Sequence, residues 1–124
     1  MHRFAHLSGS FETLDADEPY PGVTRRSFSG ERATVTAYRF EPGASFPRHS
    51  HPQEQITIIE RGEVRFTVGE FVEELQAGDW CVVPADIEHG LEATGEGAEV
   101  LALIVPRRQH PDAYSVVTGS GTAA

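Results

Sequence analysis

Three histidines and one glutamine have the types and the spacing of metal ligands. His49 and His51 lie two residues apart, and His89 ends a later segment, 78–89. Successive side chains of an extended strand point to opposite faces, so His49 and His51 would project to the same side. Gln55 has the same parity, and a second strand could supply His89. We therefore predict that these four residues bind one metal ion together.

The same spacing leaves two alternatives open. A His-x-His pair in a strand can also face the solvent and bind nothing. Glu54 could replace Gln55 as a ligand if a bulge near Pro52 turned its side chain inward. A glutamate at the edge of a strand is more typically exposed or paired with an arginine.

The elements that must position these residues are strands. No apolar stripe with the helical period of 3.6 residues persists between the glycines and prolines. Short apolar or alternating runs instead predict strands at residues 23–28, 32–40, 45–60, 63–68, 71–75, 80–83, 87–93 and 99–105, with a bend near Pro52. Eight short strands at hairpin spacing indicate an all-β sandwich or a small barrel. Periodicity alone does not distinguish these two folds.

Composition excludes several classes of partner. The chain has 124 residues, enough for one domain with a single core, and a formal net charge of −9. Its ten basic residues are all arginines and form no large cluster, so nucleic acid is not an expected partner. The apolar runs are too short to span a membrane. The single cysteine excludes an internal disulfide, and the N-terminus lacks a signal-like apolar run, so we expect a cytoplasmic protein.

Two segments resemble the sequence motifs of the cupin superfamily. The first motif, G-x5-H-x-H-x3,4-E-x6-G, spans residues 43–62, with Gln55 at the glutamate position. The second, G-x5-P-x-G-x2-H-x3-N, spans residues 78–93, with Asp86 and Ala93 at the positions of its second glycine and its asparagine. This resemblance implies an all-β fold, a single-domain jelly-roll barrel of the RmlC-like cupin type. It also implies one divalent transition metal ion per subunit (Zn, Ni, Fe or Mn), bound by His49, His51, Gln55 and His89.

Within the cupins, the chain is similar to small metal-binding proteins that ketonise unsaturated uronates in pectin degradation. The segment 49–55 and the run Pro106-Arg-Arg108 carry this similarity. Those proteins use the same metal-ligand set, but they also have a catalytic aspartate and an aromatic residue on the last strand. Ala102 and Ile104 occupy these positions here. The departure argues against assigning the same reaction, because isomerisation through an enol needs a proton-transferring carboxylate.

Other residues are candidates for catalysis and for binding a small-molecule substrate. Asp86 or Glu88 could supply the missing carboxylate if their loop covered the mouth of the barrel, and Arg108 is a third catalytic candidate. Five aromatic residues are candidates for the lining of a substrate pocket: Tyr38, Phe40, Phe46, Phe66 and Trp80.

The predicted ligand set favours one class of chemistry and leaves two others open. Three neutral imidazoles and a carboxamide leave a divalent ion its full charge, which makes it a strong Lewis acid. We therefore expect an isomerase or lyase that acts on a small oxygenated or carboxylate-bearing molecule. An iron-dependent dioxygenase and a noncatalytic binding or sensing module remain the alternatives.

The predicted domain organisation has three parts. Residues 1–21 form an N-terminal arm or edge strand, residues 22–108 form the barrel, and residues 109–124 form an extension with a mobile Gly/Ser tail. The family resemblance further implies a homodimer.

Overall fold

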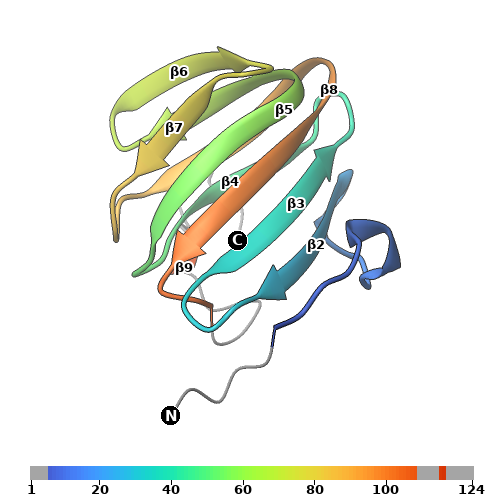
Figure 1. The fold of residues 1–124 in the computed structure, drawn as a ribbon. Helices are drawn as coiled ribbons and strands as arrows, with labels where there is room; N and C mark the ends of the chain where they lie inside the picture. The colour runs from blue at the N-terminus through green and yellow to red at the C-terminus, as the bar shows by residue number, and fades with distance from the viewer. Residues whose placement is uncertain (1–5, 109–114, 117–124) are drawn as a thin grey trace.

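The computed structural model describes residues 6–108 and 115–116, and this part of the chain is almost entirely β-structure (Figure 1). The single helix among these residues is the short 3-10 helix η1, Phe11–Thr13. The strands are β1 Asp17–Tyr20, β2 Val23–Ser29, β3 Thr34–Phe40, β4 Ser45–Ser50, β5 Glu54–Val68, β6 Phe71–Gln76, β7 Trp80–Val83, β8 His89–Val105 and β9 Ser115–Val116. The predicted all-β fold is therefore confirmed. No helix of the described residues is long and apolar enough to cross a membrane.

Two long antiparallel strands, β5 and β8, connect the two layers of a barrel. The first half of β5 pairs with the end of β8, for example Ile56 with Leu103, and its second half pairs with the start of β8, for example Phe66 with Leu91. The front layer has the order β7-β5-β8-β3-β2-β1, and the back layer has the order β6-β5-β8-β4-β9 (Figure 1). Long strands shared by two packed layers are the architecture of a single-domain jelly roll.

Glycines allow β5 and β8 to pass from one layer to the other. The register of this pair shifts near Gly62, which has a φ of 83°, and Gly97 of β8 has a φ of 100°. A Cβ atom on Gly62 would meet the carbonyl oxygen of Gly97 at 1.9 Å. Both positions therefore combine a positive φ with a close backbone approach that other residues do not tolerate.

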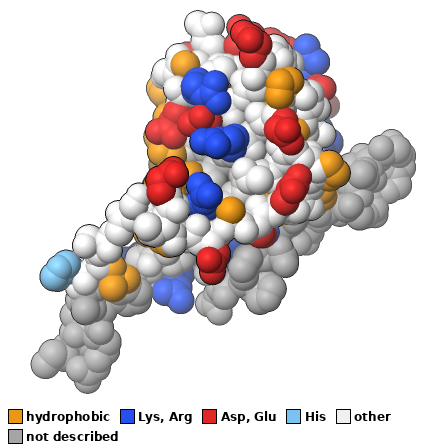
Figure 2. Space-filling model, turned by 90° about the vertical axis from the view of Figure 1, so that its right-hand side faces the viewer, with side chains coloured by type: hydrophobic (Ala, Val, Ile, Leu, Met, Phe, Trp, Pro, Cys, Tyr) orange, Lys and Arg blue, Asp and Glu red, His pale blue; other side chains and the backbone are white. Residues whose placement is uncertain are grey.

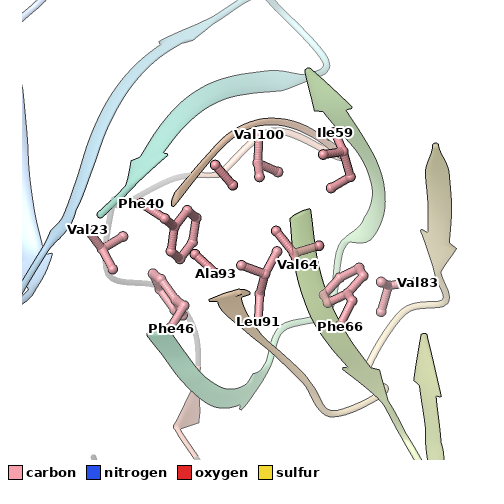
Figure 3. Close-up of a cluster of buried hydrophobic side chains, with 11 residues drawn as sticks. Val23, Phe40, Phe46, Ile59, Val64, Phe66, Val83, Leu91, Ala93 and Val100 are labelled. Carbon is pink, nitrogen blue, oxygen red and sulfur yellow. The ribbon is translucent and has the colours of Figure 1, made fainter. Parts of the chain in front are cut away.

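An apolar core fills the space between the layers (Figure 3). Its buried members come from both layers: Val23, Phe40, Phe46, Ile59, Val64, Phe66, Val83, Leu91, Ala93, Ala98 and Val100. The rings of Tyr38 and Phe46 pack edge to face, with centroids 5.9 Å apart. This packing holds the β4 strand, and with it His49, against the front layer.

The eight predicted strands differ from the nine observed ones mainly at their junctions. Residues 61–62 were expected to separate two strands, and residues 94–98 two others, yet β5 and β8 each continue through these segments. Glycines with positive φ form bulges there, and a bulge has the same sequence signal as a turn. The bend expected near Pro52 is confirmed, because β4 ends at Ser50 and β5 begins at Glu54. The predicted mobile tail lies outside the described residues.

Candidate metal centre

Three histidines from two adjacent segments converge inside the barrel. His49 of β4 and His89 of β8 are cross-strand partners, and His51 follows directly after β4. The ring centroids of His49 and His89 are 4.2 Å apart, and those of His51 and His89 are 4.9 Å apart. One potential ligand atom from each of the three lies within 4.8 Å of those of the other two. All three side chains are buried.

Backbone carbonyl groups fix the orientation of all three rings. The Nδ1 atoms of His49, His51 and His89 lie 2.9, 3.0 and 2.8 Å from the carbonyl oxygens of Pro47, Gln53 and Ile87. A carbonyl oxygen can only accept, so each Nδ1 carries the hydrogen and each Nε2 keeps a lone pair. In many proteins, a metal-binding histidine is oriented in this way by a carbonyl group that accepts from its other ring nitrogen.

Gln55 completes the group from the neighbouring strand. Its side-chain oxygen lies 3.0 Å from Nε2 of His51, and its amide nitrogen donates to the hydroxyl of Thr57 at 2.9 Å. The hydroxyl thus turns the carbonyl end of the amide toward the histidines. With the hydrogen on Nδ1, Nε2 of the neutral His51 ring and Oε1 of Gln55 are both acceptors, so neither can donate to the other. A cation bound between them would accept a lone pair from each.

The electrostatic environment keeps the histidines neutral. Burial, together with the neighbouring His89, lowers the pKa of His49 from 6.5 to about 3. Burial also lowers the pKa of His89 from 6.5 to about 4 and shifts the pKa of His51 downward. Nε2 of His89 is buried and has no hydrogen-bond partner among the residues that the structure describes. Neutral imidazoles with lone pairs aimed at one point fit a divalent transition metal ion, and such an ion would satisfy the His89 nitrogen.

A small cavity adjoins the histidines. Its volume is about 30 Å³, and its lining includes His49, Gln55, Thr57 and His89. Four of the five aromatic residues predicted to line a pocket do so: Tyr38, Phe40, Phe46 and Phe66. The prediction for Trp80 is wrong, because its side chain is 68% exposed. Strand alternation gives the reason, since Val83 of β7 is buried and Trp80 therefore points to the opposite face.

The carboxylates considered in the sequence lie away from the three rings. Glu54 is exposed and pairs across the strands with Val105, on the opposite side of β5 from Gln55. Asp86 is exposed, has a φ of 67°, and contacts His51 through its backbone N–H, which donates to the His51 carbonyl oxygen at 2.9 Å. The carboxylate of Glu88 accepts from Arg48 at 3.0 Å.

Arg108, at the end of the described barrel, lies near the histidines. Its positive charge contributes to the lowered pKa values of His49, His51 and His89. Its backbone N–H donates to the hydroxyl of Thr34 at 2.9 Å, which ties this residue to β3. The charge of Arg48 also contributes to the lowered pKa of His89, so permanent cations of two residues act on the cluster of neutral imidazoles.

Thr57 is a contributor to the site that the sequence interpretation missed. It is 1% exposed, and it orients Gln55 from two residues further along β5. Its parity with Gln55 was the available signal, because residues i and i+2 of a strand share a face.

Comparison with known proteins agrees with this fold. Residues 37–106 match the family model of the cupin domain, which is more than half of the chain. The chain belongs to the cupin family. The matched segment lies within the predicted barrel and contains all three clustered histidines. Among curated proteins, no match to the chain was found.

Several solved structures are similar to this one. An RmlC-like cupin from Shewanella frigidimarina superposes with a TM-score of 0.78 at 21% identity, over 87% of this chain and 97% of that one. KdgF from Halomonas sp. has a TM-score of 0.74 at 26% identity, over 82% and 97% of the two chains. Oxalate decarboxylase from Bacillus subtilis has a TM-score of 0.84 at 20% identity, and this chain covers 33% of its length. The predicted resemblance to RmlC-like cupins and to small cupins of the KdgF type is confirmed.

Proposed function

We propose that this protein is a metal-dependent cupin that binds one divalent transition metal ion per subunit through His49, His51, His89 and Gln55. The observation that carries this proposal is the cluster of three rings, each with Nδ1 held by a backbone carbonyl and with one potential ligand atom within 4.8 Å of those of the other two. Gln55 rather than Glu54 is the fourth ligand in this proposal, because its oxygen faces His51. The four neutral ligands suit Zn, Ni, Fe or Mn.

A metal held by neutral ligands keeps its full charge and supplies Lewis-acid chemistry, the polarisation of a carbonyl or the stabilisation of an enolate. The chain's own residues support this role. The buried rings and the lining aromatics exclude bulk water, which strengthens electrostatic interactions in the site. Thr57 fixes the amide of Gln55, and Arg108 adds a positive charge close to the rings.

The substrate that we infer is a small oxygenated molecule with a carboxylate. Arg108 is the proposed carboxylate-binding residue, because guanidinium groups bind carboxylates in a bidentate manner. The cavity of about 30 Å³ admits groups of the size of water and no sugar ring, so the bulk of any larger substrate would stay at the mouth. The reaction type that we propose is isomerase or lyase chemistry.

Full equivalence with the uronate-ketonising cupins is not part of this proposal. Ala102, at the position of their aspartate, pairs with Thr57 and with Thr36 on the inner face of the front layer. Both neighbours are threonines, whose hydroxyl groups are not bases near neutral pH. A proton-transferring carboxylate would have to come from Asp86 or Glu88, or from the substrate itself.

An iron-dependent dioxygenase is the second candidate function. The small cavity beside His49 and His89 favours it, because molecular oxygen fits a space of this size. Oxygen consumption that depends on ferrous ion, with a phenolic or diketone substrate, would support this candidate over Lewis-acid chemistry.

Elemental analysis of protein purified without a chelator or a metal-affinity tag tests the proposal. The wild-type protein should hold about one equivalent of metal, and His49→Ala should lose it. His6→Ala is the matched control, since His6 is exposed and lies outside the cluster, and it should keep the metal. Absence of metal from the wild type, even after reconstitution with each candidate ion, would contradict the proposal. Metal binding without turnover on any substrate would indicate a binding or sensing module.

A further inference from the structure

An extra residue in β4 decides which side chains of this strand face the interior. Phe46 pairs with Leu91, and His49 pairs with His89, so three residue steps on β4 match two on β8. Side chains alternate along a regular strand, and residues 46 and 49 would then point to opposite faces. Both nevertheless line the small cavity inside the barrel, where Figure 3 shows the ring of Phe46, and their ring centroids are 4.6 Å apart. A β-bulge at residues 47–48 therefore turns His49 to the face that Phe46 occupies.

The residues of the bulge and of the strand opposite suit an irregular backbone. Pro47 has no backbone N–H to donate to the ladder, and its carbonyl oxygen lies 2.9 Å from Nδ1 of His49. Gly90 of β8 lies opposite the bulge. A Cβ atom on Gly90 would lie 3.1 Å from the carbonyl oxygen of Phe46 and 3.1 Å from the backbone nitrogen of Arg48. The two backbones therefore approach so closely at the bulge that little room is left for a side chain.

The side chain of Arg48 connects the bulge to two other segments on the outside of the barrel. Its Nη2 donates to the carboxylate of Glu88 at 3.0 Å and to the carbonyl oxygen of Gly69 at 3.3 Å. The backbone N–H of Gly69 donates in turn to the carbonyl oxygen of Glu88 at 2.8 Å. Arg48 directly precedes His49, and Glu88 directly precedes His89. This partly exposed ion pair is thus the outer counterpart of the two histidines that meet inside the barrel.

An ion pair alone would not distinguish Arg48, because such pairs are frequent on this protein. Figure 2 shows acidic and basic side chains close together over one side of the molecule. Exposed pairs of this kind contribute little to stability. Arg65, for example, pairs with Glu74 at 2.8 Å across the regular ladder of β5 and β6. Arg48 differs in its position, because it belongs to the bulge and donates to acceptors from two other segments.

We propose that Arg48 is a positioning residue for the metal centre: its side chain keeps the bulge in place, and the bulge directs His49 toward His51 and His89. This inference rests on the proposed function, since it assigns the bulge a role in metal binding. Without the bulge, the end of β4 would pair with β8 in a regular register, and His49 would point away from the cavity, because a shift of one residue reverses the faces of a strand. A metal ion bound by all three histidines selects the bulged register, so the ion and Arg48 stabilise the same conformation.

Substitution of Arg48 distinguishes positioning from simple electrostatics by the sign of its effect. Burial chiefly lowers the pKa of His89, and the charge of Arg48 adds to this shift, so the charge acts on the site. Removing the charge alone should strengthen the binding of a divalent cation, whereas losing the bulge should weaken it. We expect Arg48→Ala to raise the dissociation constant for Co²⁺ about 10-fold, an effect typical of residues that orient a metal ligand.

Two further substitutions complete this measurement. Arg48→Lys keeps a charged donor and should retain most of the affinity for Co²⁺. Arg65→Ala removes an ion pair of similar length from a regular pair of strands, and it should leave the dissociation constant unchanged. Unchanged or stronger binding in Arg48→Ala, or an equal loss in Arg65→Ala, would overturn the proposal.

Two spectroscopic measurements locate the effect at His49. The visible absorption of bound Co²⁺ depends on its ligands, so the spectrum of Arg48→Ala should resemble that of His49→Ala, which a general loss of stability would not produce. In the metal-free protein, nuclear Overhauser effects between the rings of Phe46 and His49 report the bulged register, because the two rings must share one face. These signals should be present in the wild type and in Arg65→Ala and should weaken in Arg48→Ala. Full signals in Arg48→Ala would overturn the proposal.

A second variant tests the bulge without a change of charge. Gly90→Ala adds a Cβ atom where β4 and β8 approach most closely, and it should reduce both the affinity for Co²⁺ and the Phe46–His49 signals. Wild-type values of both in Gly90→Ala would contradict the role of the bulge. A wild-type protein that shows the ring signals but binds no Co²⁺ would contradict the proposed metal function instead, and the metal-free comparison would still decide whether Arg48 holds His49 in place.

Discussion

Near the candidate metal centre, the front layer of the barrel has buried polar groups among the apolar core residues of its inner face, such as Ile59 and Val100, and exposed apolar groups on its outer face. On the inner face, Thr57 and Thr36 flank Ala102 and are buried. On the outer face, one residue further along the strands, Ile58 pairs with Leu101. A sheet that covers a core usually has the reverse pattern. The buried polar groups of the inner face lie beside the candidate metal centre, where Thr57 orients Gln55.

The polarity of the inner face is confined to one part of the barrel. Further along β5, beyond Gly62, Val64 and Phe66 point inward and join the apolar core. This core stabilises the fold, so the part of the barrel around the histidines can carry buried polar groups that add little to stability. Two kinds of change test this difference between the two faces: substitutions or conditions that alter the stability of the fold, and substitutions that alter metal binding.

Acid should have the largest effect on the inner face. The folded protein holds His49 and His89 with pKa values of about 3 and about 4, below their ordinary value of 6.5. Below pH 6.5 the unfolded chain therefore binds more protons than the folded protein. The contribution of the neutral histidines to the free energy of unfolding is complete above pH 6.5, and it decreases as the pH falls toward 3. Chelator-treated protein should lose several degrees of melting temperature between about pH 7 and about pH 5. The loss should be smaller in His49→Gln, and an equal loss in this variant would contradict the account.

Equal substitutions on adjacent residues compare the two faces directly. Ile59 is 1% exposed, whereas its neighbour Ile58 points to the opposite side of the sheet and is 43% exposed. Ile59→Thr should lower the free energy of unfolding by about 2–3 kcal/mol, because it buries a hydroxyl and removes packing. Ile58→Thr should change it by less than about 0.5 kcal/mol. Urea denaturation measures both. Similar values for the two variants would contradict the assignment of faces.

The charge of the fourth ligand should affect metal binding more than stability. Gln55→Glu adds a negative charge beside the three neutral rings and should raise the affinity for a divalent ion about 10- to 100-fold. The same charge weakens the Lewis acid, so turnover of a carboxylate substrate should fall. Gln76→Glu, a change at an exposed position of β6, should alter neither quantity. Titration with the metal and steady-state kinetics distinguish these outcomes, and an unchanged affinity in Gln55→Glu would exclude Gln55 from the metal site.

The sequence predicted which side chains come together inside the barrel better than the path of the chain between them. Strand parity brought His49 and His51 to one side, and the family motifs added Gln55 and His89. The structure brings these four together from three segments, because the chain bends after β4. Parity could not establish which face of β7 is buried, since an apolar strand has no polar side to mark its exterior. The error for Trp80 came from this.

The orienting role of Thr57 should produce the smallest effect. Thr57→Val keeps the shape of a buried side chain and removes the hydroxyl that accepts from the Gln55 amide. The amide is then free to rotate its oxygen away from His51. Metal affinity should fall about 10-fold, as is usual when a residue that hydrogen-bonds a metal ligand is removed. Thr36→Val is the matched control, because Thr36 is buried on the same face and bonds Ser27 instead. It should bind metal like the wild type. If both variants lost affinity equally, the effect would come from a general disturbance of the inner face, and Gln55 would not depend on Thr57 for its orientation.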